Sequence, residues 1–91
     1  MARALLGKTL RAHERRIFIL ATLATQPELY WRPRSISRHS RSIYSDLMNL
    51  RWNGLVEELM GHPYGLTKKS LIIYRITLKG LTWLDMEVGN G

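Results

Sequence analysis

The sequence predicts an α+β domain in which three helices precede an antiparallel β-hairpin and a last helix follows it. Three observations lead to this order. An apolar stripe at helical spacing lies within residues 40–53 and stops at Gly54. Two segments rich in β-branched and aromatic residues flank a turn-rich stretch at 61–65. Thr77 then precedes a second helical stripe, so a helix is expected after the hairpin.

The first helix is predicted over residues 12–25, because Pro27 follows shortly after. Four apolar residues at helical spacing form its expected core stripe: Ile17, Leu20, Ala21 and Ala24. Phe18, Ile19 and Leu23 add apolar surface outside that stripe. We therefore expect this helix to be covered on more than one side, by the core and by a second subunit.

Residues 26–34 read as a connector. Tyr30-Trp31-Arg32 is the expected site of a short first strand within it. Pro33 disfavours a helical conformation at Arg32, so the second helix is expected to start at Pro33 or later. Ser35 is the expected N-cap of a short helix over residues 36–38.

The third helix is predicted over residues 40–53, with Ser40 as its N-cap. Ile43, Leu47 and Leu50 share one face and are expected in the core. Asp46 is expected to point towards the neighbouring helix. Arg41, Ser45, Met48 and Trp52 lie on the opposite face, and Trp52 is expected to pack on the strands of the hairpin.

Strands are predicted at 55–60 and 71–76, and a last helix at 78–88 with Thr77 as its N-cap. In that helix Leu81, Leu84 and Val88 form the stripe expected to face the core. Trp83 and Met86 fall off this stripe, which predicts that a second subunit covers them. The alternative for Trp83 is that its side chain folds back onto the first helix. The expected dimer interface therefore comprises Leu81, Trp83, Leu84 and Met86.

The composition points to an anionic partner. The 91 residues suffice for one domain, and 14 Lys and Arg against 7 Asp and Glu give a formal charge of +7. The alternative is that this charge serves only solubility. The longest apolar run, residues 17–24, is too short to cross a bilayer, and no signal-type apolar core follows the N-terminus. We therefore expect a cytoplasmic, nucleoid-associated protein without membrane contact.

No pattern of catalytic residues stands out. His13, His39 and His62 fall in different predicted elements and at no metal-ligand spacing. The chain has no cysteine and no glycine-rich phosphate loop. Glu57 and Glu58 alternate on a predicted strand, which suits a solvated edge better than acid–base work. We expect no enzyme activity, no metal, no cofactor and no small-molecule ligand.

The order of motifs resembles a known family. Ile43-Tyr44-x-x-Leu47-x-x-Leu50-x-x-x-Gly54-Leu55-Val56 and Tyr74-Arg75-Ile76-Thr77-x-x-Gly80-x-x-x-Leu84 together resemble winged helix-turn-helix regulators, in particular the PadR-like and MarR-like groups. The resemblance covers residues 36–84. It implies a three-helix core, a β-hairpin wing and a C-terminal helix. The expected organisation is a basic arm or short helix at 1–11, a winged domain at 12–77 and a dimerisation helix at 78–91.

The same resemblance makes residues 40–53 a recognition helix for the major groove of duplex DNA and places the wing, 61–70, on the backbone or in the minor groove. Expected contacts from the recognition helix are Ser40, Arg41, Ser42, Tyr44, Ser45 and Asn49. The arginine-dense turn before it supplies expected backbone contacts at Arg32, Arg34, Arg38 and His39. Expected wing contacts are His62, Tyr64, Lys68 and Lys69.

The function expected from the sequence is sequence-specific binding of double-stranded DNA by a homodimer that acts as a small transcriptional regulator, more naturally a repressor. Two alternatives remain open. One is a winged helix that serves as a protein–protein module. The other is a packaging protein that binds DNA or RNA without sequence preference.

Overall fold

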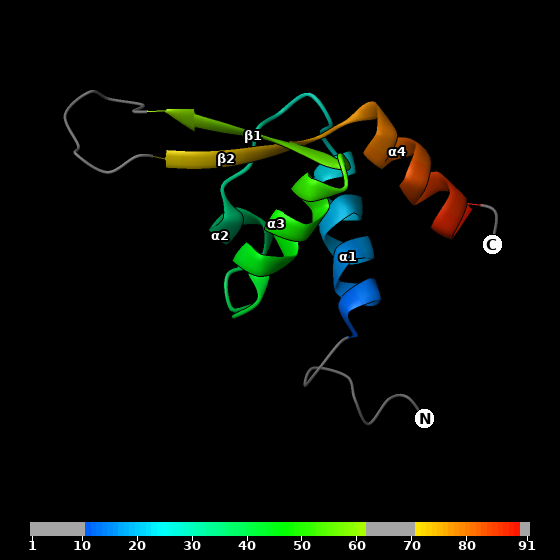
Figure 1. The fold of residues 1–91 in the computed structure, drawn as a ribbon, viewed down its shortest axis with the longest axis horizontal. Helices are drawn as coiled ribbons and strands as arrows, with labels where there is room; N and C mark the ends of the chain where they lie inside the picture. The colour runs from blue at the N-terminus through cyan, green and yellow to red at the C-terminus, as the bar shows by residue number, and fades with distance from the viewer. Residues whose placement is uncertain (1–10, 62–70, 90–91) are drawn as a thin grey trace.

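The computed structural model describes residues 11–61 and 71–89, and within them the predicted α+β class and the predicted order of elements are confirmed. The helices are α1 (Ala12–Ala24), α2 (Pro33–Ile36), α3 (Ile43–Trp52) and α4 (Leu78–Leu84), and a π-helical turn (Asp85–Gly89) continues α4. Strands β1 (Val56–Gly61) and β2 (Leu71–Ile76) form the hairpin. α1 lies between α3 and α4, and the hairpin extends away from the helices (Figure 1). This arrangement is compatible with a winged helix.

The buried face of α1 differs from the predicted one. Ile19, Leu20 and Leu23 are buried, whereas Ala21 is exposed and Ile17 is only half-buried. Ile19 and Leu23 remove more apolar area from water than Ala21 and Ala24 would, which favours this face. Phe18 lies outside it and is 52% exposed. Ile19 and Leu23 are therefore covered by the core of the same chain, and the expectation that a second subunit covers them is wrong.

The second helix starts earlier than predicted, at Pro33 instead of residue 36. Arg32 is extended (φ −78°, ψ 147°) and serves as the N-cap in place of Ser35. Proline fits this first helical position because its φ is already helical and its missing N–H has no partner there. Pro33 and Ile36 are buried, so this one-turn helix is anchored at both ends.

α3 starts later than predicted, at Ile43, with Ser42 as its N-cap in place of Ser40. The Ser42 carbonyl accepts the first helical hydrogen bond, from the Asp46 amide at 2.8 Å. Arg41 consequently lies in the turn before the helix and not in its first turn. The end of the helix is as predicted, since Gly54 takes a left-handed conformation (φ +75°).

The two faces of α3 are separated as predicted. Ile43, Leu47 and Leu50 are fully buried, and Asp46 points to α1. The expectation for Trp52 is wrong, because its side chain is 78% exposed and not packed on the strands. Trp52 lies on the side of the helix opposite the core, where no strand reaches it.

The hairpin is antiparallel, with Val56 opposite Ile76 and Gly61 opposite Leu71. β1 lies one residue later than predicted. The short first strand expected at residues 30–32 is reduced to an isolated bridge between Trp31 and Tyr74 (N···O distances 2.7 and 2.8 Å). Val56 and Ile76 close the core beneath the base of the hairpin.

α4 docks on this base. Thr77 caps it as predicted, because its Oγ1 accepts a hydrogen bond from the Gly80 amide at 3.0 Å. Leu81 and Leu84 pack against the core as predicted. Trp83 also packs against the core, and its ring meets the His13 ring edge-on at 5.7 Å. Its side chain therefore folds back onto α1, which was the alternative to its position off the packed face.

Val88 was expected in the core stripe of the last helix but is 53% exposed. The π-helical turn explains this, because its wider spacing rotates the last residues away from the α-helical stripe. Met86 is exposed as expected. Within residues 11–61 and 71–89, no helix has the length and apolar character needed to cross a membrane.

Candidate nucleic-acid interface

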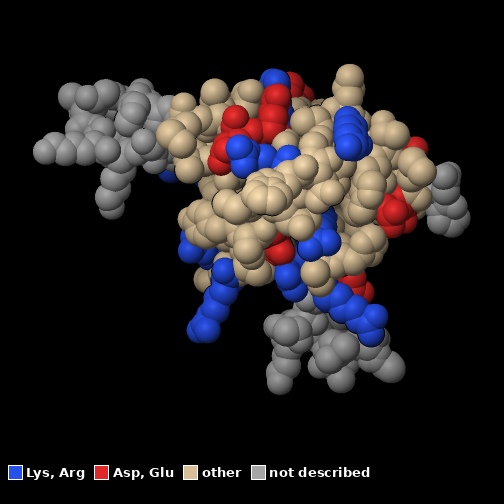
Figure 2. Space-filling model, in the orientation of Figure 1, with Lys and Arg blue, Asp and Glu red and all other residues tan. Residues whose placement is uncertain are grey.

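Five basic side chains gather at α2 and at the turn before α3. We call them the basic surface: Arg32, Arg34, Arg38, His39 and Arg41. All five are exposed, and the chain has no acidic residue from position 29 to position 45. Among the described residues, none of the five forms an ion pair. Figure 2 shows blue side chains projecting from the side on which α2 and the start of α3 lie, whereas red gathers around the base of the hairpin.

One arginine of the basic surface is held in place by its neighbours. The Arg34 Nη1 donates to the Arg38 carbonyl at 3.1 Å, and its guanidinium lies 5.3 Å from the centre of the Tyr44 ring. A guanidinium over an aromatic face is attracted by the ring quadrupole. Tyr44, expected as a DNA contact, thus also links α3 to the basic surface. Sequence reasoning missed this contact because the two residues are ten positions apart.

A hydrogen-bonded chain fixes the turn before α3. Arg15 donates to both carboxylate oxygens of Asp46, from Nε at 2.8 Å and from Nη2 at 3.1 Å. The Ser42 hydroxyl donates to the same carboxylate at 3.0 Å, and the Ser40 and Ser42 hydroxyls lie 3.2 Å apart. The hydrogen bond to Asp46 raises the pKa of Arg15 above its ordinary value. The turn that carries Arg41 is therefore tied to α1.

These hydrogen bonds give two of the predicted DNA contacts a structural role. Ser40 and Ser42 are half-buried, and the Ser42 hydroxyl is directed to Asp46. Their structural part is to hold the start of α3, while the DNA contact expected of them stays a prediction. The sequence indicated that Asp46 faces the neighbouring helix, but it did not identify Arg15 as the partner.

Four side chains form the part of α3 that points away from the core. We call this the outward face: Ser45, Met48, Asn49 and Trp52, all of them exposed. The Ser45 hydroxyl donates to the Ser42 carbonyl at 3.0 Å. The Asn49 Oδ1 accepts from the Asn53 Nδ2 at 3.2 Å, which leaves the Asn49 amide hydrogens directed elsewhere. The predicted contacts Ser45 and Asn49 thus share this face with two large apolar side chains.

The hairpin is oriented against α3 by an ion pair. Arg51 Nε lies 2.9 Å from Glu58 Oε1, and the Tyr74 hydroxyl donates to the same carboxylate at 3.3 Å. Burial, and next the neighbouring Glu58 charge, raise the pKa of Tyr74. The expected wing contacts, His62, Tyr64, Lys68 and Lys69, lie outside the described residues.

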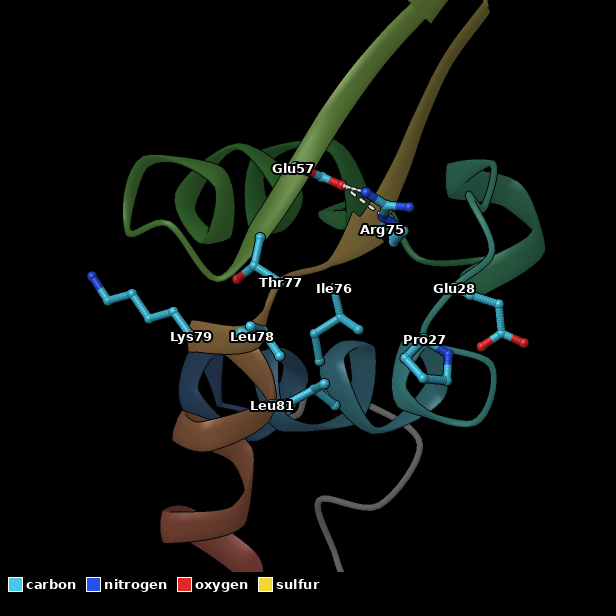
Figure 3. Close-up of a pocket in the computed structure, with 9 residues that line it drawn as sticks. All are labelled: Pro27, Glu28, Glu57, Arg75, Ile76, Thr77, Leu78, Lys79 and Leu81. Carbon is cyan, nitrogen blue, oxygen red and sulfur yellow. Dashed lines mark hydrogen bonds and ion pairs between the residues drawn. The ribbon is translucent and has the colours of Figure 1, made fainter.

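A shallow pocket of about 560 Å³ lies between the connector after α1, the base of the hairpin and the start of α4 (Figure 3). Its lining includes Ile76 and Leu81 and the ion pair between Glu57 and Arg75. Arg75 also lies 4.6 Å from the centre of the Tyr30 ring, so both charges already have partners. The pocket is wide open to solvent and shares no residue with the basic surface.

The described residues contain no group of three or more His, Cys, Asp or Glu placed to hold a metal ion. His13 lies 3.1 Å from Glu87, on the side of α4. His39 belongs to the basic surface, and His62 lies outside the described residues. Comparisons of the chain with protein-family models, with curated proteins and with solved structures give no match.

Proposed function

We propose that this chain is a winged helix-turn-helix protein that binds duplex DNA with sequence preference and acts as a small transcriptional regulator. The observation that carries the proposal is the basic surface, which borders the exposed side of a helix whose other side is fully buried. Such a helix can place its exposed side in a major groove while its buried side stays packed in the core. The arginines beside it then meet the phosphates on the groove's edge.

The contacts divide into two kinds under this proposal. Arg34 and Arg38 meet phosphates, together with Lys68 and Lys69 of the wing. Arg41 and Asn49 reach base edges, where arginine pairs with guanine and asparagine with adenine. The hydrogen bonds that join Arg15, Asp46 and Ser42 support this division, because they fix the turn that contains Arg41.

A protein–protein module is the second candidate, and the outward face favours it. Met48 is 53% exposed and Trp52 is 78% exposed, and large exposed apolar side chains are common at protein interfaces. A module of this kind would bind random duplex DNA barely at all. A packaging protein, by contrast, would bind every duplex equally well.

The test compares two variants that each remove one positive charge. Arg38→Gln removes a proposed phosphate contact of the basic surface, and Lys79→Gln changes an exposed residue of α4. Binding to a labelled random duplex is followed by fluorescence anisotropy at several salt concentrations. We expect Arg38→Gln to weaken binding and to reduce the salt slope by about 1, while Lys79→Gln leaves both unchanged. Equal effects of the two variants, or no binding by the wild type, would contradict the proposal.

Selection of bound duplexes from a random pool then tests sequence preference. The proposed function predicts a defined consensus sequence. Recovery of an unselected pool would favour the packaging protein.

A further inference from the structure

The outward face of α3 is unusual for a surface helix because its two largest side chains are apolar. Met48 and Trp52 follow each other at a spacing of four residues, so they form one strip along the helix. Neither belongs to the hydrophobic core, which Ile43, Leu47 and Leu50 complete on the opposite face. The strip therefore has no role in the packing of the described residues.

The polar members of the same face are largely committed within the chain. The Ser45 hydroxyl proton is used on the Ser42 carbonyl, and Asn49 Oδ1 already accepts from Asn53. What the outward face still offers a partner is the Asn49 amide group and the apolar strip. A duplex that meets this face is therefore contacted more by apolar surface than by hydrogen-bond donors.

The major groove presents one apolar feature, the C5-methyl group of thymine. We propose that Met48 and Trp52 contact thymine methyl groups. The protein then prefers duplexes whose pyrimidines carry a methyl group. This inference rests on the proposed function. The charge of the basic surface, which directly precedes α3, supports duplex DNA as the occupant of this face.

The spacing of the strip suits neighbouring base pairs. Four residues advance a helix by roughly 6 Å, and base pairs are stacked at about 3.4 Å, so the two side chains span about two steps. Burying a methyl group contributes about 0.8 kcal/mol, which corresponds to roughly fourfold in affinity for each contact.

Four synthetic duplexes of about two helical turns test the proposal without knowledge of the natural site. One contains only A·T pairs, and its partner replaces every thymine by uracil, which lacks the methyl group. One contains only G·C pairs, and its partner carries 5-methylcytosine. We expect the protein to prefer the methylated member of both pairs, by roughly fourfold or more. Agreement of the two pairs separates the methyl group from base identity.

Variants then assign the effect to the strip. Met48→Ala combined with Trp52→Ala should bring both ratios close to one and leave the salt slope unchanged. Leu78→Ala is the matched control, because it removes an apolar side chain that is 82% exposed on α4. It should leave the ratios as they are. Circular dichroism of each variant shows that the helices are retained.

Three outcomes would overturn the inference. If the wild type binds thymine and uracil duplexes equally, the methyl contact is wrong while the proposed DNA binding stands. If single-stranded oligonucleotides bind more tightly than the duplexes, Met48 and Trp52 serve as a stacking surface instead. If no duplex binds, the proposed function fails together with this inference.

Discussion

Asp46 and Arg15 form a pair in which the two partners are unequally buried. The Asp46 side chain is 5% exposed, whereas that of Arg15 is 31% exposed. A carboxylate left in the interior without its partner remains cut off from water, while a half-buried guanidinium can turn outwards. The cost of breaking the pair therefore depends on which residue is removed.

We predict that Arg15→Ala destabilises the fold by about 3 kcal/mol and that Asp46→Ala destabilises it less. Urea unfolding followed by circular dichroism gives both values. Arg16→Ala, the adjacent arginine in α1, serves as the control for loss of charge and helix context. A larger loss for Asp46→Ala than for Arg15→Ala would contradict this account of the pair.

The raised pKa of Tyr74 predicts that the protein loses stability at alkaline pH. Its pKa is raised above the ordinary tyrosine value of 10.0, first by burial and next by the Glu58 charge. The folded state therefore keeps the phenol proton at pH values where the unfolded state releases it. The contribution is complete below pH 10 and is lost as the pH rises through the folded pKa. Tyr74→Phe should therefore show a shallower alkaline pH dependence of its unfolding free energy than the wild type, measured by urea unfolding at several pH values.

At the scale of elements, α4 reaches the hairpin closely only because residue 80 is glycine. A Cβ at Gly80 would collide with the Leu55 carbonyl oxygen and would come within 2.8 Å of Ile76 Cγ1. Alanine favours a helix more than glycine does, by roughly 1 kcal/mol. The two effects oppose each other, and the collision involves backbone that cannot move without disturbing the base of the hairpin.

We predict that Gly80→Ala destabilises the protein by about 2 kcal/mol despite the better helix propensity of alanine. Thermal unfolding measures the effect. Lys79→Ala makes a change in the same turn of α4 at an exposed position, and it should be neutral or slightly stabilising. Stabilisation by Gly80→Ala would mean that α4 does not pack on Leu55 as described.

The elements could be predicted from the sequence where a local signal determines them. Gly54 ends α3, Thr77 starts α4, and the spacing of Ile43, Leu47 and Leu50 gives the core face of α3. Helix starts were harder to predict, because Ser40 and Ser42 are the same residue type and both suit an N-cap. The Ser42 hydroxyl donates to Asp46, a contact that the sequence does not reveal.

Contacts that join distant parts of the chain left no such signal. The buried face of α1 depends on what packs around it, so Ile19 and Leu23 could not be distinguished from Ile17 and Ala21. The same holds for the position of Trp83 on His13. In the candidate site, the cluster of arginines could be predicted because the sequence shows it as a stretch without acidic residues. The contact between the Arg34 guanidinium and the Tyr44 ring could not be predicted.

For the whole molecule we propose a homodimer formed through the end of the last helix. The reason for this proposal rests on fewer residues than the sequence indicated, because Trp83 is packed within the chain. Met86 and Val88 are the exposed apolar residues at the end of the last helix. We predict that Met86→Glu is folded and monomeric in sedimentation equilibrium. Trp83→Glu should instead lower the unfolding temperature, since it disrupts packing on α1. A monomeric wild type at tens of micromolar would contradict the dimer.

Under the proposed function, the salt dependence of DNA binding also depends on whether the protein is a dimer. The four proposed phosphate contacts on each of two subunits, Arg34, Arg38, Lys68 and Lys69, neutralise about eight phosphates. This number predicts a slope of log K against log salt near −7. One subunit alone predicts a slope near −4. Titrations of the wild type and of Met86→Glu should differ by this factor. A slope shallower than about −2 would mean that the basic surface does not meet the backbone.

The division of α3 into a buried and an outward face has a consequence for how such a protein diversifies. Ile43, Leu47 and Leu50 maintain the fold, while Ser45, Met48, Asn49 and Trp52 contribute little to it. Substitutions at these four positions should change the free energy of unfolding less than substitutions in the core do. A library randomised there and nowhere else should yield mostly folded members. Under the proposed function these members differ in the duplexes that they bind, so new specificities can arise without loss of the fold.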